Sequence, residues 1–262
     1  MKVRLGSGCW IAVALVGWAG VLLPGGLSLH AEVLRVAVAS NFRPAFEALQ
    51  PLHAGESEVK LIPSYGSTGQ LYAQIRHGAP YGVFLAADAE RPRLLEEEGL
   101  AVAGSRFTYA VGRLALWSPR EGLEFTGGSY LVEGDFRYLA LANPDLAPYG
   151  AAARALLQRR GLWEGLAGRI VRGQNIAQAF QLVDSGAAEL GFVAYAQVLA
   201  RGGGKEPAGS LWLPSAASYP AIEQQAVALE ARPAATDFLR FLRSDRVTSR
   251  LREWGYRAGS GE

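Results

Sequence analysis

Four short runs of small and polar residues have the composition of an anion-binding site. Each run follows an apolar segment and precedes an amphipathic one, at residues 39–41, 65–69, 147–150 and 173–176. A helix that begins at such a run presents main-chain N–H groups at its positive end, and hydroxyl or amide side chains add further donors. Several helix starts that face one cleft therefore bind an anion without Lys or Arg. For any single run an ordinary helix N-cap is the favoured interpretation, so the prediction depends on finding two such runs in each lobe.

The four runs contain no charged side chain, which restricts the kind of anion. A dianion that is held by neutral donors needs many charge-assisted hydrogen bonds, each worth about 1.5–3 kcal/mol. Phosphate is partly protonated near neutral pH and would favour an Asp that accepts its proton. Because no acidic residue stands in these runs, we expect a fully ionised tetrahedral oxoanion such as sulfate, molybdate or tungstate.

The segments between the runs predict the elements that hold them in place. Short runs rich in β-branched residues alternate with stretches of helical spacing, which is typical of an α/β protein with mostly parallel sheets. Two extended runs, residues 107–117 and 218–229, predict two crossings between lobes. The expected domains are lobe 1, residues 32–112 and 221–262, and lobe 2, residues 113–220. Each lobe contributes two polar runs to the cleft between them, where ligands of such folds bind.

The N-terminal segment has the organisation of a secretory signal peptide. A short basic start with Lys2 and Arg4 precedes an apolar run over residues 10–23, which is short for a bilayer span. Small residues follow, and the pattern predicts a signal peptide over residues 1–31 that is cleaved near Ala31. The mature protein is then expected in the periplasm. An uncleaved membrane anchor is the alternative.

Composition and charge exclude several classes of protein. The chain of 262 residues is half apolar and 19% charged, which excludes a disordered chain. Its formal charge of +2 comes from Lys2 and Arg4 of the predicted signal peptide, so the mature chain lacks the basic surplus of a nucleic-acid-binding protein. One Cys excludes an intramolecular disulfide, and three His leave little for a His-rich metal site. A neutral body has to hold an anion through local N–H groups and hydroxyls.

The run HGAPYGVFLAAD at residues 77–88 resembles the G-A-P-x-D-[VL]-F-x-[SA]-A-D signature of periplasmic molybdate-binding proteins. It departs from that signature at Gly82, where the family usually has Asp. Residues 147–152, 189–194 and 254–256 resemble further segments of the family, so the resemblance extends over nearly all of the mature chain. It implies the two-lobed fold of type II periplasmic binding proteins. It also implies a monomer without a cofactor that clamps molybdate or tungstate between its lobes and feeds the membrane permease of an ABC transporter.

The resemblance assigns ligand contacts to one or two residues in each of the four runs. The implied ligand-binding residues are Ser40, Asn41, Ser67, Tyr149 and Ile176. At Ile176 the implied donor is the main-chain N–H, and at Tyr149 it is the hydroxyl, as in one subgroup of the family. Packing is the alternative for Tyr149, and helix capping is the alternative for Asn41. Other members carry a Tyr at the position of Ala194, and Tyr195, one residue later, is not expected to bind.

Two other functions stay open at this point. Binding of another tetrahedral oxoanion such as sulfate is the first, and an exported serine hydrolase is the second. Little supports a hydrolase, because residues 66–69 do not match G-x-S-x-G, and Ser57-x-x-Lys60 has no S-D-N or K-T-G companion. His53 and His77 lie on helical stretches without a partner at metal-binding spacing, and both are expected at the surface. We therefore expect a binding protein and not an enzyme.

Overall fold

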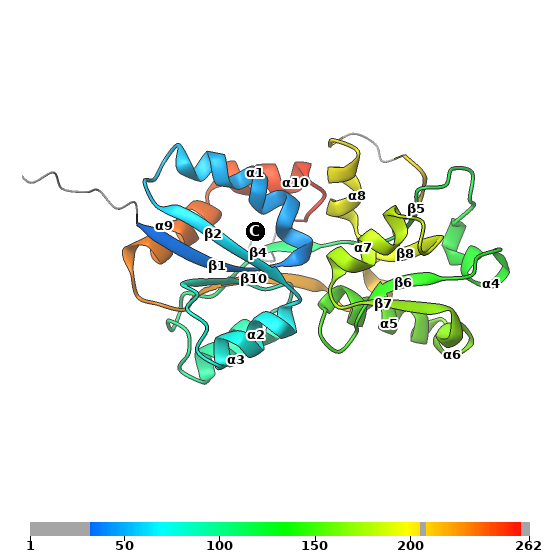
Figure 1. Cartoon of the computed structure of the whole chain (residues 1–262), viewed down its shortest axis with the longest axis horizontal. Coiled ribbons are helices and arrows are strands. Elements are labelled where there is room, and N and C mark those ends of the chain that lie inside the picture. Colours follow the sequence, from blue (N-terminus) through cyan, green and yellow to red (C-terminus); the bar gives the residue numbers. More distant parts are fainter. Residues whose placement is uncertain (1–31, 205–207, 258–262) are drawn as a thin grey trace, which may run out of the picture. The chain divides into compact units, whose positions relative to one another are not determined.

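The computed structural model describes residues 32–204 and 208–257. The predicted signal peptide and its cleavage site at Ala31 lie outside the described residues. The described chain forms two five-stranded sheets, each with its own helices (Figure 1). None of the described helices is long and apolar enough to cross a membrane. The expected α/β fold is confirmed, and each sheet with its helices is called a lobe below.

The first sheet has the strand order β2-β1-β3-β10-β4. Its strands are β1 (Val33–Ala39), β2 (Lys60–Gly66), β3 (Val83–Leu85), β4 (Phe107–Gly112) and β10 (Ile222–Ala228). The helices of this lobe are α1 (Arg43–Ala54), α2 (Thr68–Arg76), α3 (Glu90–Glu97), α9 (Pro233–Leu242) and α10 (Asp245–Glu253). A short 3-10 helix, η1 (Ser40–Phe42), joins β1 directly to α1.

The second sheet has the strand order β7-β6-β8-β5-β9. Its strands are β5 (Leu114–Ser118), β6 (Leu139–Ala142), β7 (Ile170–Gly173), β8 (Leu190–Ala194) and β9 (Ser210–Trp212). The helices of this lobe are α4 (Tyr130–Glu133), α5 (Pro148–Arg159), α6 (Trp163–Leu166), α7 (Ile176–Asp184) and α8 (Tyr195–Arg201). Short 3-10 helices lie in its connections: η2 (Thr126–Gly128), η3 (Ala167–Arg169) and η4 (Ala216–Ser218).

In each described sheet four of the five strands run in the same direction, as expected for mostly parallel sheets, and one strand runs against them. β1 pairs in parallel with β2 and β3, and β6 pairs in parallel with β7 and β8. β10 is antiparallel to β3 and β4, and β5 is antiparallel to β8 and β9. The reversed direction of β5 and β10 follows from their place directly after a crossing between the lobes. A strand that enters a lobe from the other one starts at the cleft and runs away from it, whereas its neighbours end there.

The extended run predicted at residues 107–117 is two strands in the structure. β4 pairs with β10 in the first sheet, β5 pairs with β8 in the second sheet, and only Arg113 separates β4 from β5. The chain returns to the first sheet with β10. The first sheet is therefore built from residues 33–112 and 222–228, and the second from residues 114–212.

The central strand β1 shows how the sequence determines its place. Leu34, Val36 and Val38 pack into one hydrophobic cluster, and Ala37 packs into a different one. Alternate residues of a strand point to opposite faces of the sheet, so both faces of β1 are covered. A strand that is buried on both faces needs a nearly continuous apolar run, which VLRVAVA supplies.

The space beside Gly82, the departure from the family signature, is occupied by another part of the chain. A Cβ on Gly82 would lie 2.2 Å from Glu230 Oε1 and 2.5 Å from Leu34 Cδ1. Glu230 Oε1 in turn accepts a hydrogen bond from Arg232 Nη2 at 2.6 Å. An acidic group thus occupies the space beside residue 82, although residue 82 itself has no side chain.

His53 is buried, which corrects the expectation that it lies at the surface. Its side chain is 3% exposed and packs edge-on against Phe238 and Phe241 of α9, with ring centroids 5.5 and 5.2 Å away. It stands seven residues after Phe46, on the same face of α1, and that face is the one that packs on the core. Burial lowers the pKa of His53, and the nearby Glu56 opposes this only in part.

We expect His53→Leu to reduce the loss of stability at acidic pH. With a folded-state pKa below the ordinary 6.5, the unfolded chain takes up the proton first. The free energy of unfolding is therefore largest above that pH and falls as the pH drops toward the lowered pKa. Denaturant unfolding between about pH 5 and about pH 8 measures this slope, which should flatten in the variant. His77→Leu, at an exposed position, is the matched control. Equal slopes for His53→Leu and the wild-type chain would contradict the prediction.

Candidate oxoanion-binding site

The four predicted polar runs meet at one small pocket between the two lobes. η1 and α2 of the first lobe begin at this pocket, as do α5 and α7 of the second. The pocket contains about 180 Å³ of space and is lined by Ala39, Ser40, Asn41, Gly66, Ser67, Thr68, Ala87, Ala147, Pro148, Tyr149 and Ile176. None of these described lining residues is charged. All five residues that the sequence singled out lie together here.

Ser40 supplies a buried hydroxyl at the start of η1. The residue is 4% exposed, and its Oγ has no hydrogen-bond partner among the described residues. Burying an unpaired hydroxyl costs about 1–3 kcal/mol. An acceptor on a bound anion removes that cost, so Ser40 Oγ is a fitting donor for an oxoanion.

The side chain of Asn41 is engaged within the protein. Its Nδ2 donates to Gln224 Oε1 on β10 at 2.8 Å, and it does not cap the helix, which excludes the capping alternative. Its Oδ1 is buried without a partner among the described residues. The main-chain N–H of Asn41, at the helix start, is a further group that suits an anion.

Ser67 starts α2 with a capping box. Its Oγ accepts from Gln70 N at 3.3 Å and donates to Gln70 Oε1 at 2.9 Å, and Gln70 Oε1 also accepts from Ser67 N at 3.3 Å. The neighbouring Thr68 is buried, and its Oγ1 accepts from Ala87 N at 3.0 Å. These bonds fix the first turn of α2, with its main-chain N–H groups, at the pocket.

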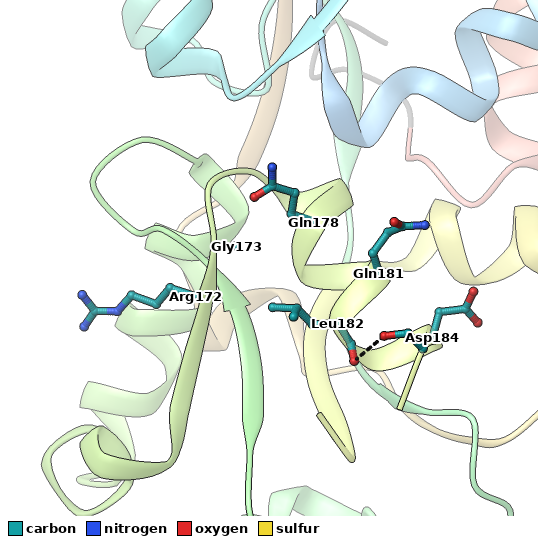
Figure 2. Close-up of a pocket in the computed structure, with 7 residues that line it drawn as sticks. Arg172, Gly173, Gln178, Gln181, Leu182 and Asp184 are labelled. Atoms are coloured by element: carbon teal, nitrogen blue, oxygen red, sulfur yellow. Dashed lines mark hydrogen bonds between the residues drawn. The ribbon is translucent and has the colours of Figure 1, made fainter. Parts of the chain in front are cut away.

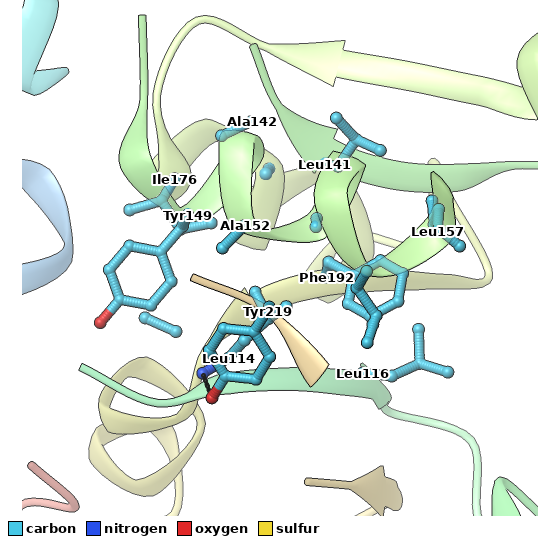
Figure 3. Packing of buried hydrophobic residues seen from close by; sticks show 14 of the residues in the cluster. Leu114, Leu116, Leu141, Ala142, Tyr149, Ala152, Leu157, Ile176, Phe192 and Tyr219 are labelled. Atoms are coloured by element: carbon cyan, nitrogen blue, oxygen red, sulfur yellow. Dashed lines mark hydrogen bonds between the residues drawn. The ribbon is translucent and has the colours of Figure 1, made fainter. Parts of the chain in front are cut away.

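Tyr149 lines the pocket and packs into the hydrophobic core of the second lobe. Pro148 occupies the first turn of α5, where a proline suits the start of a helix. The Tyr149 ring packs beside Ile176, and its hydroxyl points away from the cluster (Figure 3). Tyr149 Oη accepts a hydrogen bond from Gln224 Nε2 at 3.3 Å. Burial raises the pKa of Tyr149 well above its ordinary value, so the hydroxyl keeps a proton to donate.

Ile176 places a main-chain N–H at the start of α7. The preceding Asn175 caps this helix, since its Oδ1 accepts from Ala177 N at 3.0 Å and from Gln178 N at 3.1 Å. The cap takes the two N–H groups after Ile176 and does not include its own. The Ile176 side chain is buried in the same cluster as Tyr149, so only its main chain can bind an anion.

Two close approaches join the lobes beside the pocket. Gly69 N donates to Leu146 O at 2.9 Å, and a Cβ on Gly69 would lie 3.0 Å from that oxygen. At the end of β4, a Cβ on Gly112 would lie only 2.2 Å from Tyr149 Oη and 2.8 Å from Gln224 Nε2. The side chains at the pocket are thus packed directly against the chain where it crosses between lobes.

We expect Gly112→Ala to displace the Tyr149 hydroxyl and to lower the free energy of unfolding by about 1–3 kcal/mol, the usual cost of overpacking a core. Thermal unfolding of the purified variant measures the loss. Gly165→Ala is the matched control, because a Cβ there meets nothing within 4 Å, and it should not lower Tm. Equal Tm values for Gly112→Ala and the wild-type chain would show that this space is not tight.

Other hollows lack the features of the small pocket. One lies along β7 and α7 of the second lobe (Figure 2), lined by Arg172, Gly173, Gln178, Gln181, Leu182, Asp184 and Ser185. It follows the outside of one helix and one strand, so helix starts do not converge on it.

Another hollow, of about 760 Å³, shares Ala87, Ala147 and Pro148 with the small pocket and contains the Asp88–Arg91 ion pair. Burial raises the pKa of Asp88 despite that ion pair.

Sequence reasoning missed two residues of the site, Thr68 and Gln224. Thr68 lies inside one of the polar runs, so its position was indicated although its role was not. Gln224 lies beside Gln225 in a buried strand, and two adjacent polar side chains there require hydrogen-bond partners.

Tyr195, which was not expected to bind, does not line the pocket; its ring centroid lies 4.7 Å from the Arg113 guanidinium carbon. Within the described residues, no group of three or more His, Cys, Asp or Glu is placed to hold a metal ion.

The fold and the pocket define a two-lobed binding protein, and comparisons with known proteins agree. Residues 34–257 match the family model described as bacterial extracellular solute-binding protein. The chain is 44% identical over 230 residues to the molybdate-binding protein ModA of Azotobacter vinelandii, covering 87% of this chain and 90% of that one. It is 39% identical over 245 residues to the molybdate-binding protein ModA of Rhodobacter capsulatus, covering 92% and 95%. The solved structure of the Azotobacter vinelandii periplasmic molybdate-binding protein matches with a TM-score of 0.82 and 38% identity, covering 86% of this chain and 98% of that one.

The chain belongs to the family of bacterial extracellular solute-binding proteins. The match extends over almost the whole length of both relatives, so the chain shares their complete architecture and not a single module of it. The resemblance seen in the sequence is confirmed by these matches. The uncharged pocket between the lobes is accordingly the candidate solute site.

Proposed function

We propose that this protein captures molybdate in the pocket between its lobes and delivers it to the membrane permease of an ABC transporter. The observation that carries the proposal is the convergence of four helix starts, from two sheets, on one uncharged pocket that contains an unpartnered Ser40 hydroxyl. The names of the two relatives, both called molybdate-binding, support the choice of solute.

The proposed contacts divide between side chains and the main chain. The hydroxyls of Ser40, Ser67 and Tyr149 donate to oxygen atoms of the oxoanion. Main-chain N–H groups at Asn41 and Ile176 complete the set, at the positive ends of their helices. The Ser67 hydroxyl turns its proton from its capping partner to the anion, because a charge-assisted hydrogen bond is stronger than the neutral one it replaces.

A pocket without a carboxylate acceptor favours an anion without protons. A protonated oxoanion brings an O–H group, and leaving such a group unpaired costs about 1–3 kcal/mol. Molybdate, tungstate and sulfate are fully ionised near neutral pH, whereas phosphate is partly protonated. Tungstate has the shape and charge of molybdate, so we propose it as a second ligand, and we expect pocket size to disfavour the smaller sulfate.

Capture in the proposed function involves a hinge between the two lobes. We propose residues 32–112 with 221–262 as one lobe and residues 113–220 as the other, with hinges at Arg113 and before Ile222. The meeting of β4 and β5 at Arg113 supports this division. Closure about these two points brings the starts of α5 and α7 against those of η1 and α2.

The proposed site of action is the periplasm. The predicted signal peptide, cleaved near Ala31, supports export, and the matched Azotobacter vinelandii protein is called periplasmic. In this proposal the mature protein is a monomer that needs no cofactor and binds no nucleic acid. Its partners are the oxoanion and the permease.

The alternative of a serine hydrolase lacks a catalytic partner for Ser67. A nucleophilic serine needs a base within hydrogen-bond reach. The Ser67 hydroxyl bonds to Gln70, and neither described histidine lines the pocket: His53 is buried against α9, and His77 is exposed at the end of α2. The relatives are solute-binding proteins as well, so we propose binding without catalysis.

Calorimetric titration of the mature protein with molybdate, tungstate, sulfate and phosphate tests the proposed function. We expect tight binding of molybdate and tungstate and weak binding of sulfate and phosphate. Sulfate or phosphate binding as tight as that of molybdate would replace the proposal with another oxoanion. Ester hydrolysis that disappears in Ser67→Ala, without oxoanion binding, would replace it with the hydrolase.

We expect Tyr149→Phe to weaken molybdate binding by about 1–3 kcal/mol, roughly 5- to 150-fold in Kd, because one charge-assisted hydrogen bond is lost. The same calorimetric titration measures it. Tyr219→Phe is the matched control, since Tyr219 is buried in the same cluster, but its hydroxyl accepts from Leu114 N at 3.2 Å (Figure 3) and does not line the pocket. Unchanged binding in Tyr149→Phe would reduce Tyr149 to a packing residue.

A further inference from the structure

Gln224 lies at the centre of a buried hydrogen-bond network beside the pocket. Its side chain on β10 is 0% exposed. Its Oε1 accepts from Asn41 Nδ2 at 2.8 Å and from Tyr109 Oη at 3.1 Å, and its Nε2 donates to Tyr149 Oη at 3.3 Å. Both ends of the amide are therefore in use. Asn41 and Tyr109 belong to the first lobe and Tyr149 to the second, so this one side chain bonds to both lobes.

A β-bulge sets the direction of this side chain. β10 changes register against β4 between Gln224 and Gln225, and such a bulge re-aims side chains that would otherwise alternate strictly. Gln225 makes a separate set of bonds, accepting from Arg106 Nη1 at 2.8 Å and donating to Thr108 Oγ1 at 3.0 Å. It is 7% exposed and does not bond to any residue that lines the pocket among those described. The strand thus carries two adjacent buried glutamines, of which one is linked to the site.

The direction of the bond between Gln224 and Tyr149 determines where the tyrosine proton points. A phenol has a single proton to donate. Because Tyr149 Oη accepts from Gln224 Nε2, its own proton is directed elsewhere. Tyr149 lines the pocket, so in the proposed function this proton is directed to the bound oxoanion.

The neighbouring Asn41 amide holds the Gln224 amide in this orientation. Turning it over would set its NH2 against the Asn41 NH2, so the Gln224 amide reverses only if the Asn41 amide reverses with it. The Tyr109 hydroxyl lies 3.1 Å from Gln224 Oε1 and 3.3 Å from Ala86 O and has one proton for these two acceptors. A buried network of this kind resists rearrangement, because an unpaired polar group is costly there.

We propose that Gln224 is a positioning residue for oxoanion recognition. It donates to Tyr149, presents the tyrosine hydroxyl to the oxoanion as a donor, and thereby favours a fully ionised oxoanion over a protonated one. This inference rests on the proposed function. Tyr149 belongs to the second lobe, so its bond to Gln224 forms only when that lobe lies against β10. The Tyr149 hydroxyl is therefore aligned in the same arrangement that forms the pocket.

A double-mutant cycle with Tyr149 tests the inference. Molybdate and phosphate are titrated into the mature wild-type protein, Gln224→Met, Tyr149→Phe, the double variant and the matched control Gln225→Met, and Tm is measured without ligand. We expect Gln224→Met to weaken molybdate binding roughly tenfold. The double variant should bind within roughly threefold of Tyr149→Phe, because Gln224 acts through that hydroxyl. Gln225→Met should lower Tm but bind within roughly threefold of the wild-type chain.

Gln224→Glu gives a second and independent measurement. A carboxylate accepts from Tyr149 and turns the lone pairs of the hydroxyl toward the pocket. Molybdate binding should then fall further than in Gln224→Met, and the preference for molybdate over phosphate should narrow. If Gln224→Met does not fold, the same double-mutant cycle is measured with Gln224→Glu in its place, and it tests whether Gln224 acts through the Tyr149 hydroxyl.

Each outcome separates the inference from the proposed function. Binding unchanged in the Gln224 variants would overturn the inference alone. Losses that simply add in the double variant, or an equal loss in Gln225→Met, would show general loosening of β10 and would also overturn it. A wild-type chain that binds none of the four oxoanions would overturn the proposed function and the inference together.

Discussion

An anion held without charged side chains is the constraint on which the rest of the structure depends. In the proposed function a dianion leaves water for a buried pocket, and only main-chain N–H groups, hydroxyls and the positive ends of helices offset the cost. A single helix start offers few such groups, so several have to begin at the same place. η1 and α2 supply two of them and α5 and α7 supply the other two, from opposite lobes.

This requirement accounts for the arrangement of the two sheets. β1, β2 and β7 each end at a polar run and β6 ends shortly before one, whereas β5 and β10 run the other way because they carry the chain between lobes. Apolar residues close the pocket from both sides, since Ala39 and Ala87 of the first lobe belong to the same cluster as Tyr149 and Ile176 of the second. The interface between the lobes is therefore part of the core as well as part of the site.

Signals that are local in the sequence predicted the helix starts, and partners far apart in the sequence were not predictable. Ser67 and Gln70 are three residues apart, so their capping box is visible in the chain. The bond between Asn41 and Gln224 spans 183 residues, and no pattern along the chain connects the two. His53 shows a different limit: helical spacing places it on the apolar face of α1, yet its polar side chain suggested the surface. His53 is buried because Phe238 and Phe241 of α9 pack against it, and α9 lies far from α1 in the sequence.

The hydrogen bond from Gly69 N to Leu146 O connects the lobes through main-chain atoms alone. It does not involve the solute. In the proposed hinge motion it therefore favours the closed form before capture, and apparent affinity scales with the population of that form. Replacement of the Leu146 side chain keeps both bonded atoms. A side chain at residue 69 also keeps them but crowds the bond, because its Cβ would lie 3.0 Å from the Leu146 oxygen and 3.3 Å from Arg91 Nη2. In the proposed hinge motion, the equilibrium between open and closed forms thus depends on residue 69, which donates this bond and carries no side chain to crowd it.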